Sequence, residues 1–499
     1  MEEQQLRKKI LVATKWSSIT EIIAKIIVPL TTIILARVLA PEAFGVIATI
    51  TMIISFVEMF TDAGFQKYLV QHEFKDEKEK HRNANVAFWT NFVLALFLWG
   101  LIITFNEQIA ILVGNPGLGI VVIVACVQLP LTSFSSIQMA LFRRDFNYKT
   151  LFIVRVISIL IPFIVTIPLA VSGFNYWSLI IGTIVMHVFN AVFLTIKSNW
   201  KPTFFYNLKI LKEMLSFSMW SLIVAIFIWI SAWVDAFIIG YYFSEYYLGI
   251  YKTSTIMVNS ILGIITGATV PILFSALSRL QNDNIKFNDL FFKFQRLVSA
   301  LLLPIGIGVF LFRDLVTQLM LGDQWKEASV IIGIAALSNS ITIVLGHFSS
   351  IVYQAKGKPK LSLLAEILHL VVLVPTIIIS AKYGFWVLVY ARSLIRIQII
   401  IVHLIIMKLA INIQILKTLK NVLPSLISAG VMWILGYFIL RLSESLQWNI
   451  FSIVICVIFY FGILLLFPSM RKEISLLITK LLPDKMLKKV YLPFIKRSS

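Results

Sequence analysis

The 499-residue sequence has few cysteines and few charged residues. Its two cysteines, Cys126 and Cys456, lie far apart in apolar runs, which excludes a disulfide framework and a Cys/His zinc cluster. Charged residues make up 14% of the chain, whereas an average soluble domain has about 25%. No GxxxxGK[ST] loop occurs, which excludes ATP hydrolysis by the usual P-loop chemistry. The sequence is therefore not that of a soluble, redox, zinc-binding or P-loop protein.

Long apolar runs fill most of the sequence instead, and 59% of the residues are hydrophobic. A bilayer span requires about 20 mostly apolar residues, and such windows predict an all-α polytopic membrane protein with about 14 transmembrane helices. The first window is too long for the core of a signal peptide, so we expect it to remain as an anchor. The predicted spans are 16–39, 44–70, 84–104, 118–142, 150–171, 176–196, 216–243, 249–277, 293–312, 328–353, 361–381, 385–407, 418–442 and 449–467.

The positive charge follows the predicted topology. Most of the 44 Lys and Arg residues lie in the N-terminal tail, in alternate connections between spans, or in the C-terminal tail. Cytoplasmic loops retain positive charge, which predicts that both termini lie in the cytoplasm. The net charge of +20 is therefore a topology signal and does not indicate nucleic-acid binding.

Short segments recur along the chain. Trp16-Ser17 matches Trp220-Ser221, and Phe44-Gly45-Val46 matches Leu248-Gly249-Ile250, each pair 204 residues apart. Another echo links Gly173-Phe174 with Gly384-Phe385. Because six is an even number of spans, the repeat predicts two tandem six-helix lobes in the same orientation, followed by two extra helices. The predicted parts are an N-terminal lobe at 1–212, a C-terminal lobe at 213–410, helices 13 and 14 at 411–469, and a basic cytoplasmic tail at 470–499.

The basic tail has an apolar stripe. Ile474, Leu477, Ile478 and Leu481 stand at helical spacing among basic residues. This pattern is typical of an amphipathic helix that rests on anionic lipid at the membrane surface.

Ionisable residues inside the apolar spans are the best candidates for function, because they are costly there and usually face a cavity or a partner. Glu21 and Lys25 lie four residues apart in the first span, as do Glu58 and Asp62 in the second. Their depths predict that Lys25 meets Glu58 near the middle of the membrane. A structural ion pair and a cavity role in handling substrate or protons both fit this pattern.

A second group lies near the end of the chain. The twelfth span carries Arg392 and Arg396, four residues apart, and the eleventh carries Glu366 and His369. Two guanidinium groups on one helical face suit a phosphate, while a buried salt bridge between Glu366 and Arg396 is the structural alternative. Glu366 and His369 alone provide too few ligands for a metal. Neither a metal site nor a cofactor is predicted.

Two more charged residues lie in the seventh and eighth spans. Asp235 is a candidate carrier of a proton or cation, although it could simply hydrogen-bond a neighbouring helix. Lys252 lies near the predicted outer end of the eighth span. The lone histidines His187, His347 and His403 are predicted to be packing residues.

Several of these segments occur in a recognisable order, among them LARVLAPEAFG at 35–45, DAGFQ at 62–66, FRRDF at 142–146, LGIY at 248–251 and LGDQW at 321–325. Together they resemble the oligosaccharide flippases of the MOP superfamily, the Wzx-type polysaccharide exporters. The likeness covers roughly residues 9–409, and fourteen spans resemble the subgroup with two extra helices.

The resemblance implies a transporter and not an enzyme. It would move an undecaprenyl-diphosphate-linked oligosaccharide across the bacterial cytoplasmic membrane by alternating access, during biosynthesis of a surface polysaccharide such as lipopolysaccharide or exopolysaccharide. Lys25, Lys252, Arg392 and Arg396 are then candidates for binding the diphosphate and glycan. Glu21, Glu58, Asp62, Asp235, Glu366 and His369 are candidates for lining the cavity or coupling H⁺ or Na⁺. A polysaccharide polymerase and glycosyltransferases are the expected protein partners.

Three alternatives stay open. A cation-coupled multidrug antiporter would have the same two lobes. A lipid II flippase of the same superfamily places arginines in its first, second and eighth helices, where this sequence offers only Lys25 and Lys252. A membrane-bound polymerase or glycosyltransferase usually needs sizeable outer loops, and the predicted outer connections are short.

Overall fold

A computed structural model describes residues 2–62, 64–443 and 445–473. Within this part of the chain, fourteen helical segments are long and apolar enough to cross a membrane, which confirms the predicted fold class. Large apolar side chains on these helices are exposed, including Ile164 (73%) and Ile272 (64%), as expected of surfaces that face lipid. The predicted amphipathic stripe Ile474, Leu477, Ile478 and Leu481 lies outside the described residues.

The chain folds into two compact units, each assembled from separate segments. The first unit comprises Met1–Ser260, Thr317–Ala328 and Leu370–Arg392. Its complete helices are α1 (Glu2–Val38), α2 (Pro41–Asp62), α3 (Phe65–Gln71), α4 (Glu77–Thr104), α5 (Asn106–Leu112), α6 (Gly119–Ala125), α7 (Gln128–Arg144), α8 (Tyr148–Ile161), the π-helical η1 (Pro162–Thr166), α9 (Ile167–Val171), α10 (Tyr176–Lys197), α11 (Leu208–Tyr242) and the 3-10 turn η2 (Asp323–Trp325).

The second unit comprises Ile261–Val316, Ser329–His369 and Ser393–Ser499. Its helices are α13 (Asn284–Leu311), α15 (Ala328–Thr342), the π-helical η3 (Ile343–His347), α16 (Phe348–Ala355), α19 (Arg396–Ile406), the π-helical η4 (Met407–Ile411), α20 (Ile415–Leu440) and α21 (Leu446–Leu464). Five helices contribute residues to both units. One is α15, whose first residue, Ala328, belongs to the first unit, and the others are α12 (Glu245–Arg279), α14 (Arg313–Met320), α17 (Lys360–Ala381) and α18 (Phe385–Leu394).

Several helices begin further from the apolar core than the hydropathy windows predict, because polar residues cap them. Asp76 accepts a hydrogen bond from the Glu79 backbone N–H (2.6 Å), so α4 starts at Glu77 and not near 84. Asp283 accepts likewise from the Lys286 N–H (3.1 Å) and starts α13. A side-chain acceptor at the N-cap satisfies a backbone donor that the helix itself leaves unpaired.

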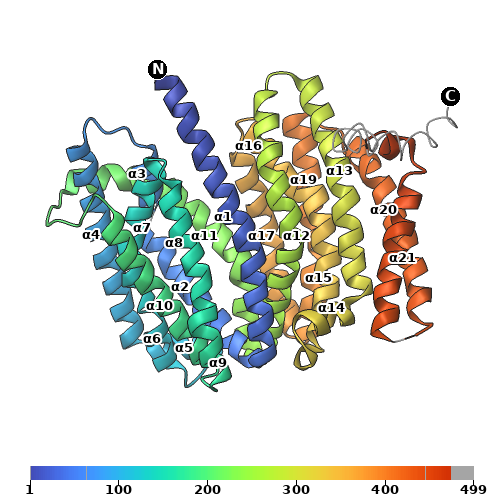
Figure 1. Ribbon diagram of the computed structural model, residues 1–499, viewed down its shortest axis with the longest axis horizontal. Helices are drawn as coiled ribbons and strands as arrows, with labels where there is room; N and C mark the ends of the chain where they lie inside the picture. Colours follow the sequence, from blue (N-terminus) through green and yellow to red (C-terminus); the bar gives the residue numbers. More distant parts are fainter. Residues whose placement is uncertain (1, 63, 444, 474–499) are drawn as a thin grey trace. The chain divides into compact units, whose positions relative to one another are not determined.

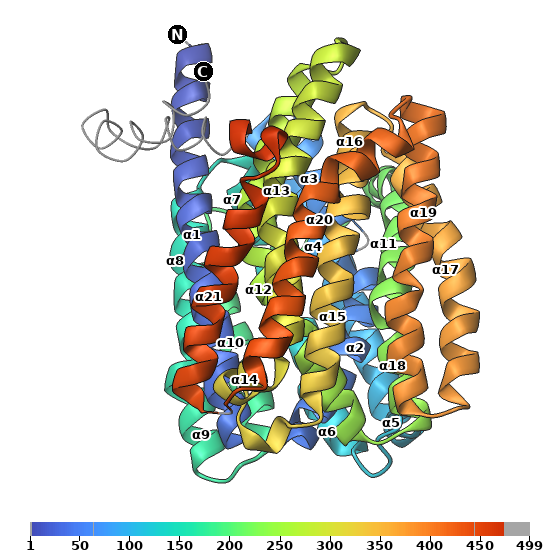
Figure 2. The same cartoon turned by 90° about the vertical axis from the view of Figure 1, so that its right-hand side faces the viewer.

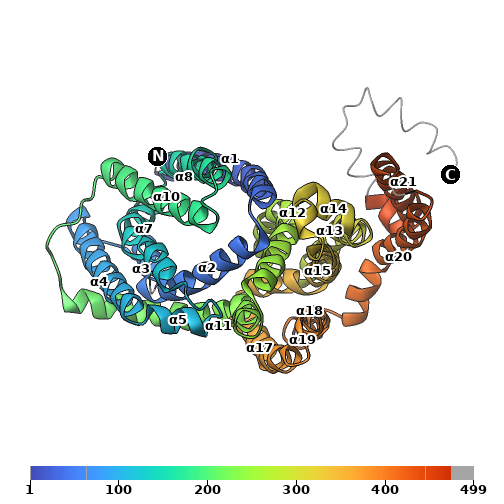
Figure 3. The same ribbon diagram turned by 90° about the horizontal axis from the view of Figure 1, so that it is seen from below.

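The first unit is built around α7, which packs against α3, α4 and α10, while α1 lies beside α8 (Figures 1 and 3). At one end, α3, α4, α7 and the segment before α11 share an apolar core that includes Phe65, Leu69, Phe88 and Trp200. This core fixes the positions of the helices that line the cavity described below.

The two segments that recur 204 residues apart meet each other inside the first unit. A Cβ atom at Gly45 of α2 would lie 1.8 Å from the carbonyl oxygen of Glu245, and one at Gly249 of α12 would lie 1.9 Å from that of Pro41. The contact is reciprocal, since Pro41 and Glu245 also stand 204 residues apart. Such a pairing of equivalent surfaces is the pattern that a two-fold relation produces.

A second contact joins the end of α1 to the segment around η2. Trp325, which is fully buried, donates from Nε1 to the Ala36 carbonyl oxygen (2.7 Å). Gln324 donates from Nε2 to the same oxygen (2.6 Å) and to that of Leu39 (3.0 Å), and Arg37 donates to the Leu319 carbonyl oxygen (2.6 Å). The last carbonyls of α1, which lack partners within the helix, are thus satisfied by a distant segment.

In the second unit, α20 and α21 lie side by side and α20 packs along α13 (Figure 2). Arg296 of α13 donates to Asn421 of α20 (2.7 Å) and to Glu473 (2.8 Å), and Lys293 lies 3.4 Å from the same carboxylate. Tyr460 of α21 donates to the Ala300 carbonyl oxygen (2.9 Å). Polar contacts therefore attach the two extra helices to α13.

Candidate functional site

A cavity of about 630 Å³ lies among α2, α3, α4, α7, α10 and α11 of the first unit. Its volume is within the roughly 300–1,000 Å³ that is typical of small-molecule sites. The polar and aromatic residues that line it are Ser55, Glu58, Thr61, Asp62, Gln66, Lys67, Asn91, Thr132, Ser135, Ser136, His187, Asn190, Ser221, Trp229 and Trp233.

The carboxylates of the cavity come from the end of α2. Glu58 and Asp62 are one helical turn apart, so both point to the same face, and both line the cavity. Asp62 accepts a long hydrogen bond from the Gln66 backbone N–H (3.4 Å), which links it to the start of α3. The structure thus brings two of the predicted acidic residues together at one site.

Neutral polar and aromatic residues line the cavity from α10 and α11. Asn190 of α10 accepts a hydrogen bond from the Ser158 hydroxyl (2.6 Å). Trp229 of α11 donates from Nε1 to Ser55 Oγ (3.0 Å), and its ring lies 4.8 Å from that of Phe56. His187, predicted to be a packing residue, lines the cavity as well.

A second cluster of charges borders this cavity. Asp235 of α11 forms an ion pair with Arg392 of α18, with 3.1 Å between Oδ2 and Nε. Tyr251 of α12 donates from its hydroxyl to the same oxygen (2.7 Å). Both charged side chains are largely buried, Asp235 at 8% exposure and Arg392 at 14%. A buried pair of this kind holds together only with further hydrogen bonds, which Tyr251 supplies.

Lys252 connects the cluster to the cavity. Its Nζ atom lies 3.9 Å from the ring centre of Trp233, a cation–π contact, and donates to the Ala232 carbonyl oxygen (3.3 Å). Trp233 and Ala232 both line the cavity. With Asp235 and Arg392 neutralising each other, Lys252 leaves the cluster with a net positive charge. An acidic region and a basic region therefore adjoin within one unit.

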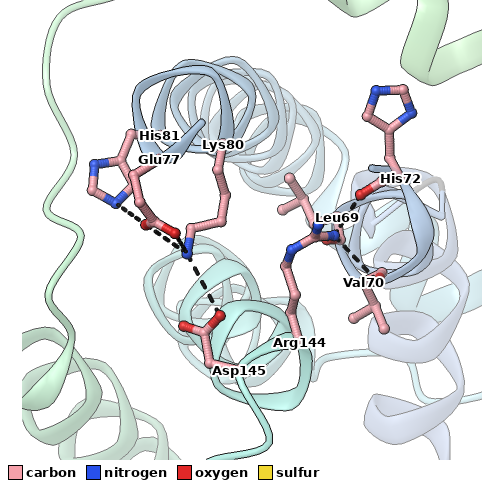
Figure 4. A network of polar contacts seen from close by, with 8 residues as sticks. All are labelled: Leu69, Val70, His72, Glu77, Lys80, His81, Arg144 and Asp145. Carbon is pink, nitrogen blue, oxygen red and sulfur yellow. Dashed lines mark hydrogen bonds and ion pairs between the residues drawn. The ribbon is translucent and has the colours of Figure 1, made fainter. Parts of the chain in front are cut away.

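A network of polar contacts holds three of the cavity helices in place (Figure 4). Lys80 of α4 pairs with Glu77 (2.7 Å) and with Asp145 after α7 (3.5 Å). Arg144 of α7 donates to three carbonyl oxygens at the end of α3, those of Leu69, Val70 and His72. Its guanidinium also lies 4.5 Å from the ring centre of Phe74. The network joins α3, α4 and α7, each of which contributes lining residues.

The remaining predicted residues lie elsewhere. Glu21 is exposed and Lys25 half-buried on α1, which packs against α8 and α9, and neither is among the residues that line the cavity. The expected meeting of Lys25 with Glu58 stays a prediction. In the second unit, His369 of α17 contacts Gln398 of α19, with 2.8 Å between Nδ1 and Oε1. Gln398 was not among the predicted residues. The predicted salt bridge between Glu366 and Arg396 would join the same two helices.

Arg392 and Arg396 were predicted to form one phosphate site. The helix is interrupted between them, since α18 ends at Leu394 and α19 begins at Arg396, and they belong to different compact units. Their joint role stays a prediction. The structure does join Arg392 to Asp235, two residues that were predicted for separate roles.

Sequence reasoning missed Asn91, Asn190, Trp229, Trp233 and Tyr251. Polar and aromatic residues inside the apolar spans were the available signal, but they are uncharged and common in such spans. Within residues 2–62, 64–443 and 445–473, no group of three or more His, Cys, Asp or Glu side chains is placed to hold a metal ion.

The fold is similar to that of two solved membrane proteins. The chain is similar to the lipid II flippase MurJ in an inward closed conformation, with a TM-score of 0.72, 14% identity, and 90% of this chain and 98% of MurJ covered. It is also similar to an inward-facing multidrug resistance MATE transporter of the MOP superfamily, with a TM-score of 0.57, 15% identity, and coverage of 84% and 98%. These likenesses show the fold.

The family of this chain is shown by a match of its sequence to a family model. Residues 34–330 match the family model described as polysaccharide biosynthesis protein, and the chain belongs to that family. It is 24% identical over 310 residues to the succinoglycan biosynthesis transport protein ExoT of Rhizobium meliloti (strain 1021), a match that spans 62% of each chain. It is 20% identical over 387 residues to the lipopolysaccharide biosynthesis protein WzxC of Escherichia coli (strain K12), with 76% of each covered.

A further relative comes from Bacillus subtilis (strain 168). The chain is 21% identical over 371 residues to the teichuronic acid biosynthesis protein TuaB of Bacillus subtilis (strain 168), with 72% of this chain and 73% of TuaB covered. The predicted resemblance to polysaccharide exporters with a MOP fold is confirmed.

Proposed function

We propose that this protein is a flippase that moves a lipid-linked oligosaccharide across the bacterial cytoplasmic membrane for surface polysaccharide biosynthesis. The observation that carries the proposal is the family match over residues 34–330. Its relatives bear the names of proteins of succinoglycan, lipopolysaccharide and teichuronic acid biosynthesis. The fold it shares with a lipid II flippase supports transport of a large amphiphile and not group-transfer chemistry.

The cluster of Asp235, Arg392 and Lys252 is the proposed contact for the diphosphate. Arginine presents a planar fork of donors that matches phosphate oxygens, and Lys252 adds a point charge beside it. Asp235 holds Arg392 in place through a single bond to Nε (3.1 Å). An incoming diphosphate would compete with Asp235 for the guanidinium, so this ion pair is the proposed point at which substrate binding changes the charge balance of the site.

The orientation of the chain is part of the proposal. The distribution of Lys and Arg supports cytoplasmic placement of both termini. The acidic residues Glu58 and Asp62, together with Asp235, are the candidates for coupling transport to H⁺ or Na⁺. The predicted lobes at 1–212 and 213–410 would then alternate access to the site.

The function can be tested in proteoliposomes that contain the purified full-length chain. An undecaprenyl-diphosphate oligosaccharide with a fluorophore on its glycan is reconstituted, and dithionite outside the vesicles bleaches the label as it reaches the outer leaflet. We expect faster bleaching than in protein-free vesicles.

Lipid II and a cationic drug serve as competing substrates. Transport of the drug alone would identify a multidrug antiporter, and transport of lipid II alone a lipid II flippase; either result contradicts the proposal.

A further inference from the structure

The cavity of the first unit has the chemistry of a sugar-binding site. Residues with amides and hydroxyls line it on several helices, including Asn91 of α4, Ser136 of α7 and Asn190 of α10. Asn91 donates to Ser136 Oγ (3.1 Å), and Asn190 Oδ1 accepts from Ser158, which leaves the Asn190 amino group as a donor. An amide group both donates and accepts hydrogen bonds, and so does a hydroxyl. A polyhydroxylated ligand requires this mixture, because each of its hydroxyl groups must replace the hydrogen bonds that it makes with water.

Two tryptophans provide rigid apolar surfaces in the same cavity. Trp229 and Trp233 lie four residues apart on α11 and therefore share one helical face. The Trp229 ring is held by its hydrogen bond to Ser55 Oγ (3.0 Å) and by its contact with Phe56. A pyranose has one apolar C–H face, which packs on an aromatic ring, while its edge hydroxyls point to polar groups. A small ligand is usually oriented by aromatic rings in fixed positions together with a small number of precisely placed polar groups.

The charges of the cavity restrict which sugars fit. Glu58 and Asp62 are acidic, and the basic side chains among the described residues that line it are Lys67 and His187. The adjacent Arg143 is exposed and donates to Gln66 Oε1 (3.1 Å). A carboxylated sugar would place like charges together, which weakens its binding. Hydroxyls and ammonium groups can donate to the two carboxylates.

We infer that this cavity is the glycan subsite of the transporter, and that it selects uncharged or amino sugars over uronic acids. The inference rests on the proposed function and extends it. Trp233 marks the boundary, because its ring lines the cavity and also carries Lys252 at 3.9 Å. The substrate is therefore oriented with its diphosphate toward Lys252 and Arg392 and its sugars along Trp229 toward Glu58 and Asp62.

Binding of free glycans tests the subsite without requiring transport. The full-length chain in nanodiscs is titrated with cellotetraose, a glucosamine tetramer and tetragalacturonate, and binding is followed by saturation-transfer difference NMR and tryptophan fluorescence. We expect the first two to bind and tetragalacturonate to bind at least about tenfold more weakly. Equal binding of tetragalacturonate, or no binding of the first two, would overturn the inference.

Variants separate a binding role from a structural one. Trp229→Ala should weaken binding about tenfold, as expected when an aromatic anchor is removed. Trp99→Ala is the control, because Trp99 bonds the Ile123 carbonyl oxygen in the same unit and does not line the cavity. Glu58→Gln combined with Asp62→Asn should raise tetragalacturonate binding to the level of cellotetraose, whereas Glu42→Gln, exposed on the same helix, should not.

The same variants distinguish the outcomes. If the double carboxylate variant loses ion-driven transport and keeps the wild-type sugar preference, the carboxylates serve ion coupling and the inference is wrong. If wild-type protein moves the lipid-linked oligosaccharide and binds no free glycan, the inference fails and the proposed function stands. If it binds glycans and moves no lipid-linked substrate, the proposed function fails instead.

Discussion

Gly45 and Gly249 pack against each other's helices at equivalent positions of the repeat. A Cβ atom at either would lie less than 2 Å from a main-chain oxygen of the other helix, that of Glu245 or Pro41. Main-chain atoms cannot move aside as a flexible side chain can. The crossing of α2 and α12 in the first unit therefore requires glycine at both positions.

Alanine at either glycine should destabilise the protein. Overpacking a close contact costs about 1–3 kcal/mol, so we expect Gly45→Ala and Gly249→Ala each to lower the thermal unfolding midpoint in detergent. Gly100→Ala on α4 is the control, because a Cβ there meets nothing within 4 Å. Unchanged unfolding midpoints for both variants would show that the helices separate readily at this crossing.

The Asp235–Arg392 pair should respond differently to single and double substitution. Arg392→Gln leaves a carboxylate buried without its cation, which costs about 3–5 kcal/mol. Adding Asp235→Asn should restore most of the stability, because two neutral amides can hydrogen-bond each other. Stability is measured by thermal unfolding, with the exposed Lys382→Gln as the control.

Transport by the same variants tests the proposed phosphate role. The double variant should fold and yet fail to move the lipid-linked substrate, since it has no guanidinium for the diphosphate. Wild-type transport by a stable double variant would mean that the pair is purely structural.

Arg144 should be irreplaceable by lysine. Its guanidinium reaches three carbonyl oxygens and the ring of Phe74, which a single ammonium group cannot do. We expect Arg144→Lys to cost about 1–3 kcal/mol, measured as a shift in thermal unfolding. The neighbouring Arg143→Lys should have less effect, because Arg143 is exposed and makes one hydrogen bond to Gln66. Equal effects would argue against the network.

Glu473 should hold the segment that follows α21 to α13. It is 8% exposed and contacts both Arg296 and Lys293. Glu473→Gln removes the negative charge, and loss of charged hydrogen bonds costs about 1.5–3 kcal/mol. Glu42→Gln, exposed on α2, is the control. A normal unfolding midpoint for Glu473→Gln would mean that these ion pairs do not hold the segment after α21 to α13.

The sequence allowed the helices to be predicted better than their contacts. Hydropathy identifies spans because lipid demands about 20 apolar residues, and all fourteen correspond to helices. It underestimates their length wherever a capped polar turn extends the helix, as at Asp76. The pairing of Asp235 with Arg392 was not predictable, because the residues are 157 apart and the rotation of each helix is set by packing.

The site was predicted in part for the same reason. Glu58, Asp62, Asp235, Lys252 and Arg392 were found because ionisable groups are rare in apolar spans. Trp229 and Asn190 are ordinary residues in such spans, and only the fold places them around one cavity.

The contact between Trp325 and the end of α1 has a consequence for biosynthesis. The Ala36 carbonyl oxygen accepts from a side chain 289 residues further along the chain. At about 5–20 residues per second, the ribosome needs on the order of 15–60 seconds to produce that partner. Throughout this interval the last turn of the first helix stands in the membrane without the hydrogen bonds of the finished protein, so its completion must wait until most of the chain has been made.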